Sequence, residues 1–298
     1  MEVLKSEYLE KLRQIKKIEL NDYEQTAFIL SDGRLFVCYN KYCEVYNLKD
    51  NYHRDLVISE IPKVFHGMGI VKLHSGKLFS YKNENIMIWS ITNNTVNWEI
   101  ILEKFTNDHI VKAKPFTNNR IGIINCYQFI YLYNTNSPYN LLKEIRINYN
   151  DFLHDLDQLK NQEKFICIGH YNRAFLINII TEQVELTIVC TTFNSFEANN
   201  TLYIKSKYLI MLLDTQTLKV KLSQRRDERT MGKTFFCYSE FREDSILFET
   251  GKNSLGLYNK KDDTFEFKSL RNIVDILKID DNHFVFFLNE PSILFYEL

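Results

Sequence analysis

The sequence predicts an all-β fold built from seven copies of one short repeat. A bulky apolar residue followed by a small polar or acidic residue recurs seven times, at steps of 36 to 45 residues. These closing pairs are Tyr46-Asn47, Trp89-Ser90, Tyr133-Asn134, Ile177-Asn178, Leu213-Asp214, Tyr258-Asn259 and Tyr296-Glu297. A period near forty residues with several short strands per repeat is typical of a radial β architecture, in which each repeat forms one small sheet, or blade.

The second repeat shows the strands of one blade most clearly. Residues 69–73, 77–81, 85–89 and 95–102 are apolar runs of strand length, and short polar turns separate the first three. Four short strands joined by tight turns form one antiparallel sheet. We therefore expect a four-stranded sheet in every repeat, and a seven-bladed β-propeller for the chain as a whole.

Asparagine takes the place of glycine in many of the predicted turns. The chain has only nine glycines among its 298 residues. Asn118 and Asn119, for example, precede the second strand of the third repeat. Asparagine tolerates a left-handed backbone and hydrogen bonds to its own main chain, so we expect it to form these turns. The fourth repeat is the irregular copy, because residues 151–164 are polar and are expected to hold a short helical turn.

Residues 75–90, with the sequence SGKLFSYKNENIMIWS, resemble the central part of a WD40 repeat. Trp89-Ser90 stands where that family has Trp-Asp, and three histidines precede the closing residues of repeats two to four by 23 or 24 residues. This is the lower limit of the spacing of the family's structural histidine. The resemblance implies that certain positions are structural parts of the blades and not metal ligands: His66, Trp89, His109, Tyr133, His154 and Asp214.

The two ends of the chain are predicted to meet in the last blade. The seventh repeat lacks a fourth strand, and residues 13–20 are strand-like and otherwise unassigned, so we expect them to supply it. Residues 1–12 have the apolar spacing of a short amphipathic helix. The expected organisation is an N-terminal helical extension over 1–12 and a single propeller over 13–298, closed by the strand at 13–20.

Composition narrows the possible function classes. The net charge of −1 gives no reason to expect a nucleic acid partner. No apolar run reaches the ~18 residues that a transmembrane helix needs, and the first residues lack the apolar core of a signal peptide, so we expect a cytoplasmic protein. The six cysteines lack C-x-x-C spacing, which favours buried free thiols over a zinc site. A disulfide between neighbouring strands is the alternative.

Motifs for catalysis are absent from the sequence. There is no glycine-rich phosphate loop, no G-x-S-x-G and no H-E-x-x-H. Asp155 and Asp157 lie beside His154, but such a trio in a polar stretch is more often solvated than catalytic. We therefore expect no enzyme activity, no cofactor and no metal.

Aromatic and basic residues gather at the predicted turns between the second and third strands. These turns fall on the same face of the ring in every repeat, and tyrosine and arginine are enriched in protein-binding hot spots. The residues expected to bind a partner there are Tyr81, Tyr127, Tyr171, Arg173 and Tyr208. The alternative is that a β protein with 18 tyrosines places several at strand ends by composition alone.

A basic loop between the fifth and sixth repeats is the second candidate. Arg225, Arg226 and Arg229 lie there, on the same face as the tyrosines, and arginines suit an anionic partner. Arg225-Arg226 also resembles the double-arginine site of propellers that bind phosphoinositides. However, Asp227 follows the pair, and an acidic residue beside a phosphate site is unfavourable.

The sequence thus favours a non-catalytic scaffold that binds other proteins through one face of a propeller, as a subunit of a larger assembly. The first alternative is a phosphoinositide-binding propeller that meets a membrane lipid through the basic loop. The second alternative is a propeller enzyme with a site in a central funnel.

Overall fold

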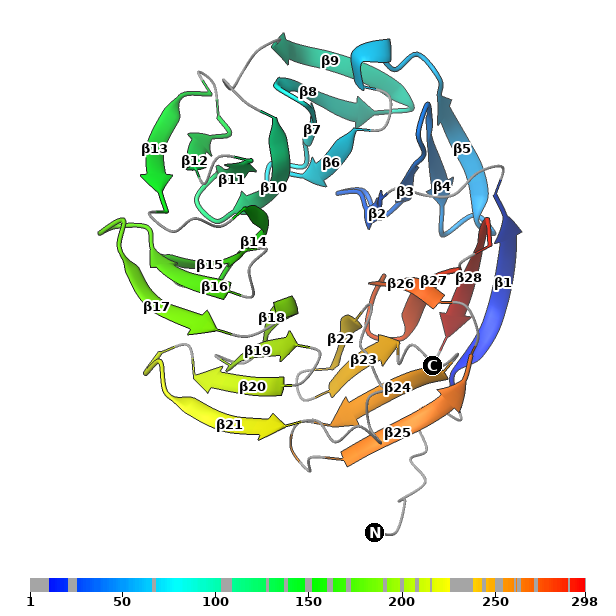
Figure 1. Cartoon of the computed structure of the whole chain (residues 1–298). Coiled ribbons are helices and arrows are strands. Elements are labelled where there is room, and N and C mark those ends of the chain that lie inside the picture. The colour runs from blue at the N-terminus through cyan, green and yellow to red at the C-terminus, as the bar shows by residue number, and fades with distance from the viewer. Residues whose placement is uncertain are drawn as a thin grey trace. The chain divides into compact units, whose positions relative to one another are not determined.

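A computed structural model gives the fold of the chain (Figure 1). It describes residues 11–20, 26–65, 68–102, 109–126, 129–136, 139–147, 152–159, 163–169, 173–189, 192–198, 201–206, 209–214, 216–225, 238–242, 245–249, 254–259, 261, 264–270, 273–288 and 290–297. Strands among these residues form seven four-stranded sheets, each built from strands that neighbour one another in the chain, with one exception in sheet A. The helix expected over 1–12 lies outside the described residues except at its last two positions.

The chain divides into two compact units, one of residues 30–225 and the other of residues 1–29 with 226–298. The expected single domain over 13–298 therefore stays a prediction. Each unit consists of four-stranded sheets stacked face to face over apolar cores.

Sheets C to F lie wholly in the first unit, residues 30–225, and so do three strands of sheet B. The fourth strand of sheet B, β2, belongs to the second unit. Sheet B consists of β2 (Thr26–Ile29), β3 (Leu35–Cys38), β4 (Cys43–Asn47) and β5 (His53–Ile58), and the 3-10 helix η1 (Lys63–Phe65) follows it. Sheet C consists of β6 (Gly69–Lys72), β7 (Leu78–Lys82), β8 (Asn85–Thr92) and β9 (Thr95–Leu102). Sheet D consists of β10 (Ile110–Phe116), β11 (Arg120–Asn125), β12 (Phe129–Asn134) and β13 (Leu141–Arg146). Sheet E consists of β14 (Leu153–Gln158), β15 (Lys164–Gly169), β16 (Arg173–Asn178) and β17 (Val184–Val189). Sheet F consists of β18 (Thr192–Ala198), β19 (Thr201–Ser206), β20 (Leu209–Asp214) and β21 (Val220–Arg225).

Sheets G and A make up the second unit, together with β2. Sheet G consists of β22 (Tyr238–Arg242), β23 (Ser245–Glu249), β24 (Ser254–Asn259) and β25 (Thr264–Ser269). Sheet A consists of β26 (Ile273–Lys278), β27 (His283–Leu288), β28 (Ser292–Glu297) and β1 (Arg13–Glu19).

Strand β1 is the outer strand of the last sheet, where the sequence predicts a strand from the N-terminus. It pairs antiparallel with β28, with Ile18 opposite Ile293. Arg13 forms an ion pair of 2.9 Å with Glu297 at one end of this pairing. Leu12, just before β1, is 2% exposed and belongs to the core between sheets G and A. The N-terminal segment is thus built into the last sheet through its backbone and its apolar side chains.

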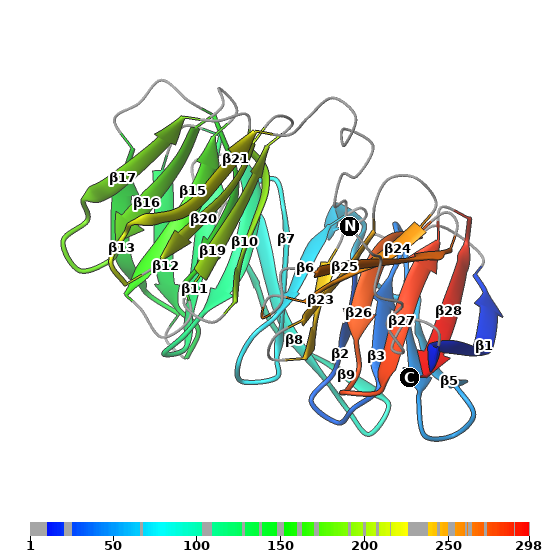
Figure 2. The same ribbon diagram turned by 90° about the horizontal axis from the view of Figure 1, so that it is seen from below.

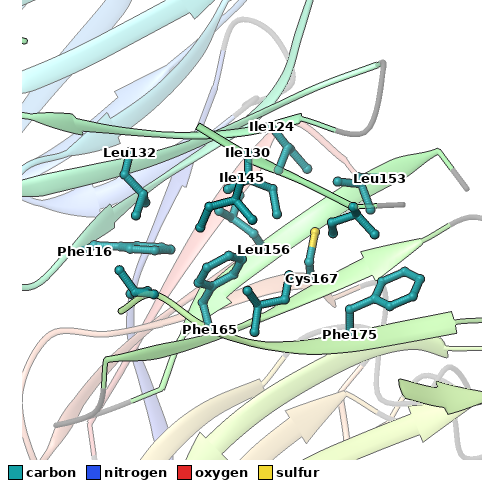
Figure 3. Packing of buried hydrophobic residues seen from close by; sticks show 13 residues of the cluster. Phe116, Ile124, Ile130, Leu132, Ile145, Leu153, Leu156, Phe165, Cys167 and Phe175 are labelled. Atoms are coloured by element: carbon teal, nitrogen blue, oxygen red, sulfur yellow. The ribbon is translucent and has the colours of Figure 1, made fainter. Parts of the chain in front are cut away.

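Apolar residues between successive sheets form the core of the first unit. Between sheets D and E, Phe116 and Phe165 meet at 5.7 Å between ring centroids, and Leu156 and Cys167 pack close by (Figure 3). A second cluster lies between sheets C and D, and a third between sheets E and F. Because both faces of each inner sheet are covered, the middle strands are buried along most of their length, as in β15 and β16.

Left-handed backbone at asparagine confirms the turn chemistry expected from the sequence. Asn118 and Asn119 have φ angles of 60° and 53°, and Asn83 has a φ of 53°. The polar member of a closing pair forms the next turn: the Asn178 Oδ1 atom accepts hydrogen bonds from the backbone N–H groups of Ile180 and Thr181 at 2.9 and 3.2 Å. The recurrence of these pairs in the sequence therefore has a structural cause.

The expected helical turn in the fourth repeat is wrong for most of its length. Residues 153–158 form strand β14, which pairs with β15 and has a β-bulge between Leu153 and Asp155. The bulge inserts one extra residue and shifts the side-chain alternation, so that Leu153, Leu156 and Leu159 are all buried. A spacing of three between buried leucines suggests a helix, but here it belongs to a bulged strand.

Candidate protein-binding edge

Sheets D and E each have two ends, and we name them by their turns. The upper edge carries the β11–β12 and β15–β16 turns, the ends of β13 and β17, and the start of β14. The lower edge carries the β12–β13 and β16–β17 turns and the starts of β11 and β15. Both sheets lie in the first compact unit and share one core, and Figure 2 shows their strands side by side. The upper edge is where the sequence predicts partner binding.

A stacked arginine and an aromatic ring mark the upper edge of sheet D. Phe129 and Arg146 are opposite each other in the register of β12 and β13. The Arg146 guanidinium carbon lies 5.6 Å from the centre of the Phe129 ring, and Arg146 is exposed. The Asn125 Oδ1 atom accepts a hydrogen bond of 3.1 Å from the Phe129 backbone N–H, which fixes the start of β12. This cation–π pair presents a positive charge on a rigid apolar support.

Exposed apolar side chains mark the upper edge of sheet E. Val189 ends β17 and is 77% exposed, and it is opposite Arg173 in the strand register. Phe152, one residue before β14, is 54% exposed. Arg173, a predicted partner contact, begins β16 and is partly buried. Among these residues, phenylalanine and arginine are of the kinds enriched in protein interfaces.

Tyr81, in contrast, lies in the core and not on a binding surface. It is 8% exposed and packs in the cluster between sheets C and D. Burial raises the pKa of its phenol, while a hydrogen bond from the Ala113 backbone N–H opposes that effect and the charge of Asp155 adds to it. Its ring covers Gly69, where an added Cβ would be 2.3 Å from the Tyr81 Cζ atom. Tyr81 is therefore a packing residue of the inner strands, and its prediction as a partner contact is corrected.

Several predicted site residues lie outside the described residues: Tyr127, Tyr171, Tyr208, Arg226, Arg229 and His66. Arg225 ends strand β21, and its side chain is not described. The basic loop and most of the tyrosine turns thus stay predictions. Apart from Arg173, the described residues that mark the upper edge were not predicted from the sequence: Phe129, Arg146, Phe152 and Val189. Phe129 and Arg146 each stand beside a turn, but only the strand register brings them together.

The predicted structural positions take different places in the sheets. Trp89 is fully buried, and its Nε1–H group donates a hydrogen bond of 2.8 Å to the Ser80 hydroxyl. The Asp214 Oδ1 atom accepts hydrogen bonds from the backbone N–H groups of Gln216 and Thr217. Burial raises the pKa of Tyr133 to about 12, with further contributions from Tyr131 and Glu144.

The two described histidines of the predicted series lie near the starts of inner strands. His109 is exposed and directly precedes β10. His154 is half-buried and occupies the bulge of β14. His109 stands one residue before the start of its strand and His154 one residue after it, so their role as structural histidines stays a prediction. Within the described part of the chain, no group of three or more His, Cys, Asp or Glu residues is placed to hold a metal ion.

A buried carboxylate in sheet B is a polar feature that the sequence did not predict. Glu44 is 1% exposed, and it accepts hydrogen bonds from the Tyr39 and Tyr46 hydroxyls at 3.0 and 2.6 Å. Arg54 donates to its other oxygen at 2.6 Å. Burial raises the pKa of Tyr46, and its hydrogen bond to Glu44 raises it further. The carboxylate is fully engaged by its own sheet, so Glu44 holds β4 and β5 together.

Two further observations concern membrane-spanning helices and cysteines. Among the described residues, no helix has both the length and the apolar character to cross a bilayer. Cys38, Cys43 and Cys167 are buried free thiols, and Cys126 is a partly buried one. Cys38 and Cys43 are opposite each other in the register of β3 and β4.

Comparisons with known proteins identify the fold. No protein-family model matches the chain, and no curated protein is similar to it in sequence. Among solved structures, a chain in the crystal structure of a mitotic checkpoint complex superposes with a TM-score of 0.75 over 96% of this chain and 94% of that chain, at 9% sequence identity. At this identity the similarity establishes architecture only, and it agrees with the repeated four-stranded sheets. The chain therefore has the fold of a WD40-like β-propeller.

Proposed function

We propose that this chain is a non-catalytic, seven-bladed propeller that binds another protein through the upper edge of sheets D and E. The seven sheets and the pairing of β1 with β28 support a ring closed by the N-terminal strand. The similar solved structure is a complex of proteins, which supports a role as a subunit of an assembly. The buried free thiols support a reducing, intracellular compartment.

One observation supports the upper edge as the binding surface. The Arg146–Phe129 stack, Arg173, Phe152 and Val189 place two cations and exposed apolar groups at one end of two neighbouring sheets. The framework beneath them is rigid, because both sheets share a packed core. A rigid surface that combines arginine with apolar groups suits a partner segment with acidic and apolar residues. Tyr127 and Tyr171 add aromatic groups to this edge if they face outward, as the sequence predicts.

Affinity purification with quantitative proteomics tests this proposal. The upper-edge variant combines Arg146→Glu with Val189→Asp, and a second variant combines Tyr127→Ala, Tyr171→Ala and Arg173→Ala. Ile180→Asp is the matched control, because Ile180 is 68% exposed at the lower edge of the same sheet. We expect a partner that binds the upper edge to be lost from both variants and retained by the control. A partner set that is unchanged in both variants, at unchanged thermal stability, contradicts the proposal.

A further inference from the structure

Cations at the lower edge follow a repeated pattern in three sheets. A cation directly before or at the start of the second strand pairs with an acid in the outer strand of the same sheet. The pairs are Arg34–Asp55 at 3.7 Å, Lys77–Glu99 at 2.6 Å and Lys164–Glu185 at 2.7 Å. In all three sheets the acid is the extra residue of a β-bulge in the outer strand. It directly follows the residue that pairs with the apolar member of the closing pair. The bulge thus aims a carboxylate at the cation.

Sheet D departs from this pattern at one residue. Its outer strand β13 has the same bulge, and the extra residue is Leu142 instead of an acid. Leu142 is 46% exposed. The corresponding cation, Arg120, instead pairs with Glu163 of sheet E through two hydrogen bonds of 2.8 and 3.0 Å. An apolar side chain therefore stands at the solvent where sheets B, C and E have a charge.

Two more exposed apolar residues stand at this end of sheets D and E. Leu141 precedes Leu142 and is 44% exposed, and Ile180 in the β16–β17 turn is 68% exposed. Lys143 joins the two sheets at this point, because its ammonium group donates to the Ile180 carbonyl at 3.1 Å and to Glu182 at 2.8 Å. We call Leu141, Leu142 and Ile180 the lower apolar patch.

The two cations beside the lower apolar patch, Arg120 and Lys143, are already paired within the protein. Arg120 pairs with Glu163, and Lys143 pairs with Glu182. A charged partner group at this place would compete with these pairs or lose its own hydration without a counterion. An uncharged apolar group loses nothing of this kind and gains from covering three exposed aliphatic side chains.

We propose that the lower apolar patch is a second interaction surface, which takes an uncharged, apolar segment of another protein. The anchor of such a segment is one large aliphatic or aromatic side chain set against Leu142 and Ile180. The salt bridges on either side form the polar rim that excludes water from the anchor. This surface lies at the opposite end of the sheets from the upper edge, so its existence does not depend on the proposed function.

Selection of random short peptides displayed on phage tests the proposal on the full chain. The decisive variant is Leu142→Glu, which gives sheet D the acid that sheets B, C and E have and places it near Arg120. It is therefore expected to leave the thermal midpoint unchanged or raised. Ile180→Asp removes the other side of the patch, and Val189→Asp at the upper edge of sheet E is the matched control.

We expect wild-type protein to enrich uncharged peptides with one or two large apolar side chains. Their affinity should fall about tenfold or more for Leu142→Glu and Ile180→Asp, the loss typical of one hot-spot contact, and stay unchanged for Val189→Asp. Failure to enrich uncharged apolar peptides, or binding of such peptides that Leu142→Glu and Ile180→Asp leave intact, would overturn the proposal. So would acidic or basic peptides whose binding Leu142→Glu abolishes, whereas acidic peptides whose binding only Val189→Asp abolishes belong to the upper edge.

Two measurements exclude other occupants of the patch. Sedimentation velocity of the wild type and of Leu142→Glu tests whether the patch joins two copies of this chain. Co-sedimentation with phosphatidylcholine vesicles tests whether it meets a lipid surface. A dimer or vesicle binding that Leu142→Glu abolishes overturns the assignment to a partner segment, and a monomer that ignores vesicles supports it.

Discussion

Single residues show how a β-rich chain with few glycines makes its tight turns and close contacts. In closing pairs such as Ile177-Asn178 and Leu213-Asp214, a buried apolar residue is followed by a polar one that builds the next turn. Glycine is kept where a side chain must be absent. At Gly69, the Tyr81 ring occupies the volume that a Cβ would need.

Gly69→Ala is expected to destabilise the protein by about 1–3 kcal/mol, because the new methyl group overpacks a filled core. The measurement is urea unfolding of Gly69→Ala, Tyr81→Leu and the double variant. Leucine lacks the ring atoms that lie within 3 Å of the added Cβ, so Gly69→Ala should cost much less in the Tyr81→Leu background. Equal costs in both backgrounds would mean that Tyr81 does not cover Gly69.

The residues also show what the sequence could not reveal about the candidate site. Tyr81 stands beside a predicted turn, and its position in the sequence suggests exposure. In the structure, four successive residues of β7, Leu78 to Tyr81, are buried, because neighbouring sheets cover both faces. Periodicity cannot assign a face to a strand that is buried on both sides. The Arg146–Phe129 stack was missed for a related reason: its members are 17 residues apart and meet only through the register.

At the scale of elements, strands and turns could be predicted well from the sequence, and bulges could not. The strands of the second repeat begin within a residue of their predicted positions, and β8 alone ends much later than predicted, at Thr92 instead of residue 89. In β14 the bulge produces a helix-like spacing of leucines, and a single sequence does not reveal a bulge. The bulges in the outer strands are equally hidden, although they decide which side chain meets the lower-edge cations.

Strand β1 is expected to contribute to stability, since it covers the edge of β28 and brings Leu12 into the core. Removal of residues 1–20 should lower the thermal midpoint by several degrees, at roughly 2–4 °C per kcal/mol for a domain of this size, and should promote aggregation through the opened edge. Removal of residues 1–10 alone keeps β1 and is the matched control. An unchanged midpoint after removal of residues 1–20 would contradict the role of β1.

The Lys164–Glu185 pair at the lower edge should make stability depend on pH. Burial on its own raises the pKa of Glu185, but hydrogen bonds from Lys164 and Asn178 outweigh it, and the pKa lies below the usual value. A lowered carboxyl pKa stabilises the folded state at pH values above the unfolded pKa, and this contribution is lost as the pH falls through the folded pKa.

Glu185→Gln is therefore expected to destabilise the protein modestly at pH 7, by less than about 1 kcal/mol for a pair near the surface. The difference from wild type should shrink below about pH 4, where the carboxyl group takes up a proton. Urea midpoints of both proteins at the two pH values measure this. A difference that is the same at both values would show that the charge of Glu185 does not contribute.

At the scale of the whole molecule, the repeat in the sequence predicted the number of sheets, their strand order and the place of β1. These features follow from short-range patterns of apolar and polar residues. The binding surfaces depend instead on which residues of different sheets come together, and here the sequence showed only part of the upper edge and nothing of the lower apolar patch. The proposed closure of the seven sheets into one ring is the central prediction at this scale.

Small-angle X-ray scattering of the purified chain tests ring closure most directly. A single closed propeller of 298 residues should be as compact as other folded domains of its length, with a radius of gyration of about 19 Å. The account predicts this value, unchanged across protein concentrations, for the wild type. A clearly larger radius for the monomer, as expected for two separate compact units joined by a flexible chain, would contradict it.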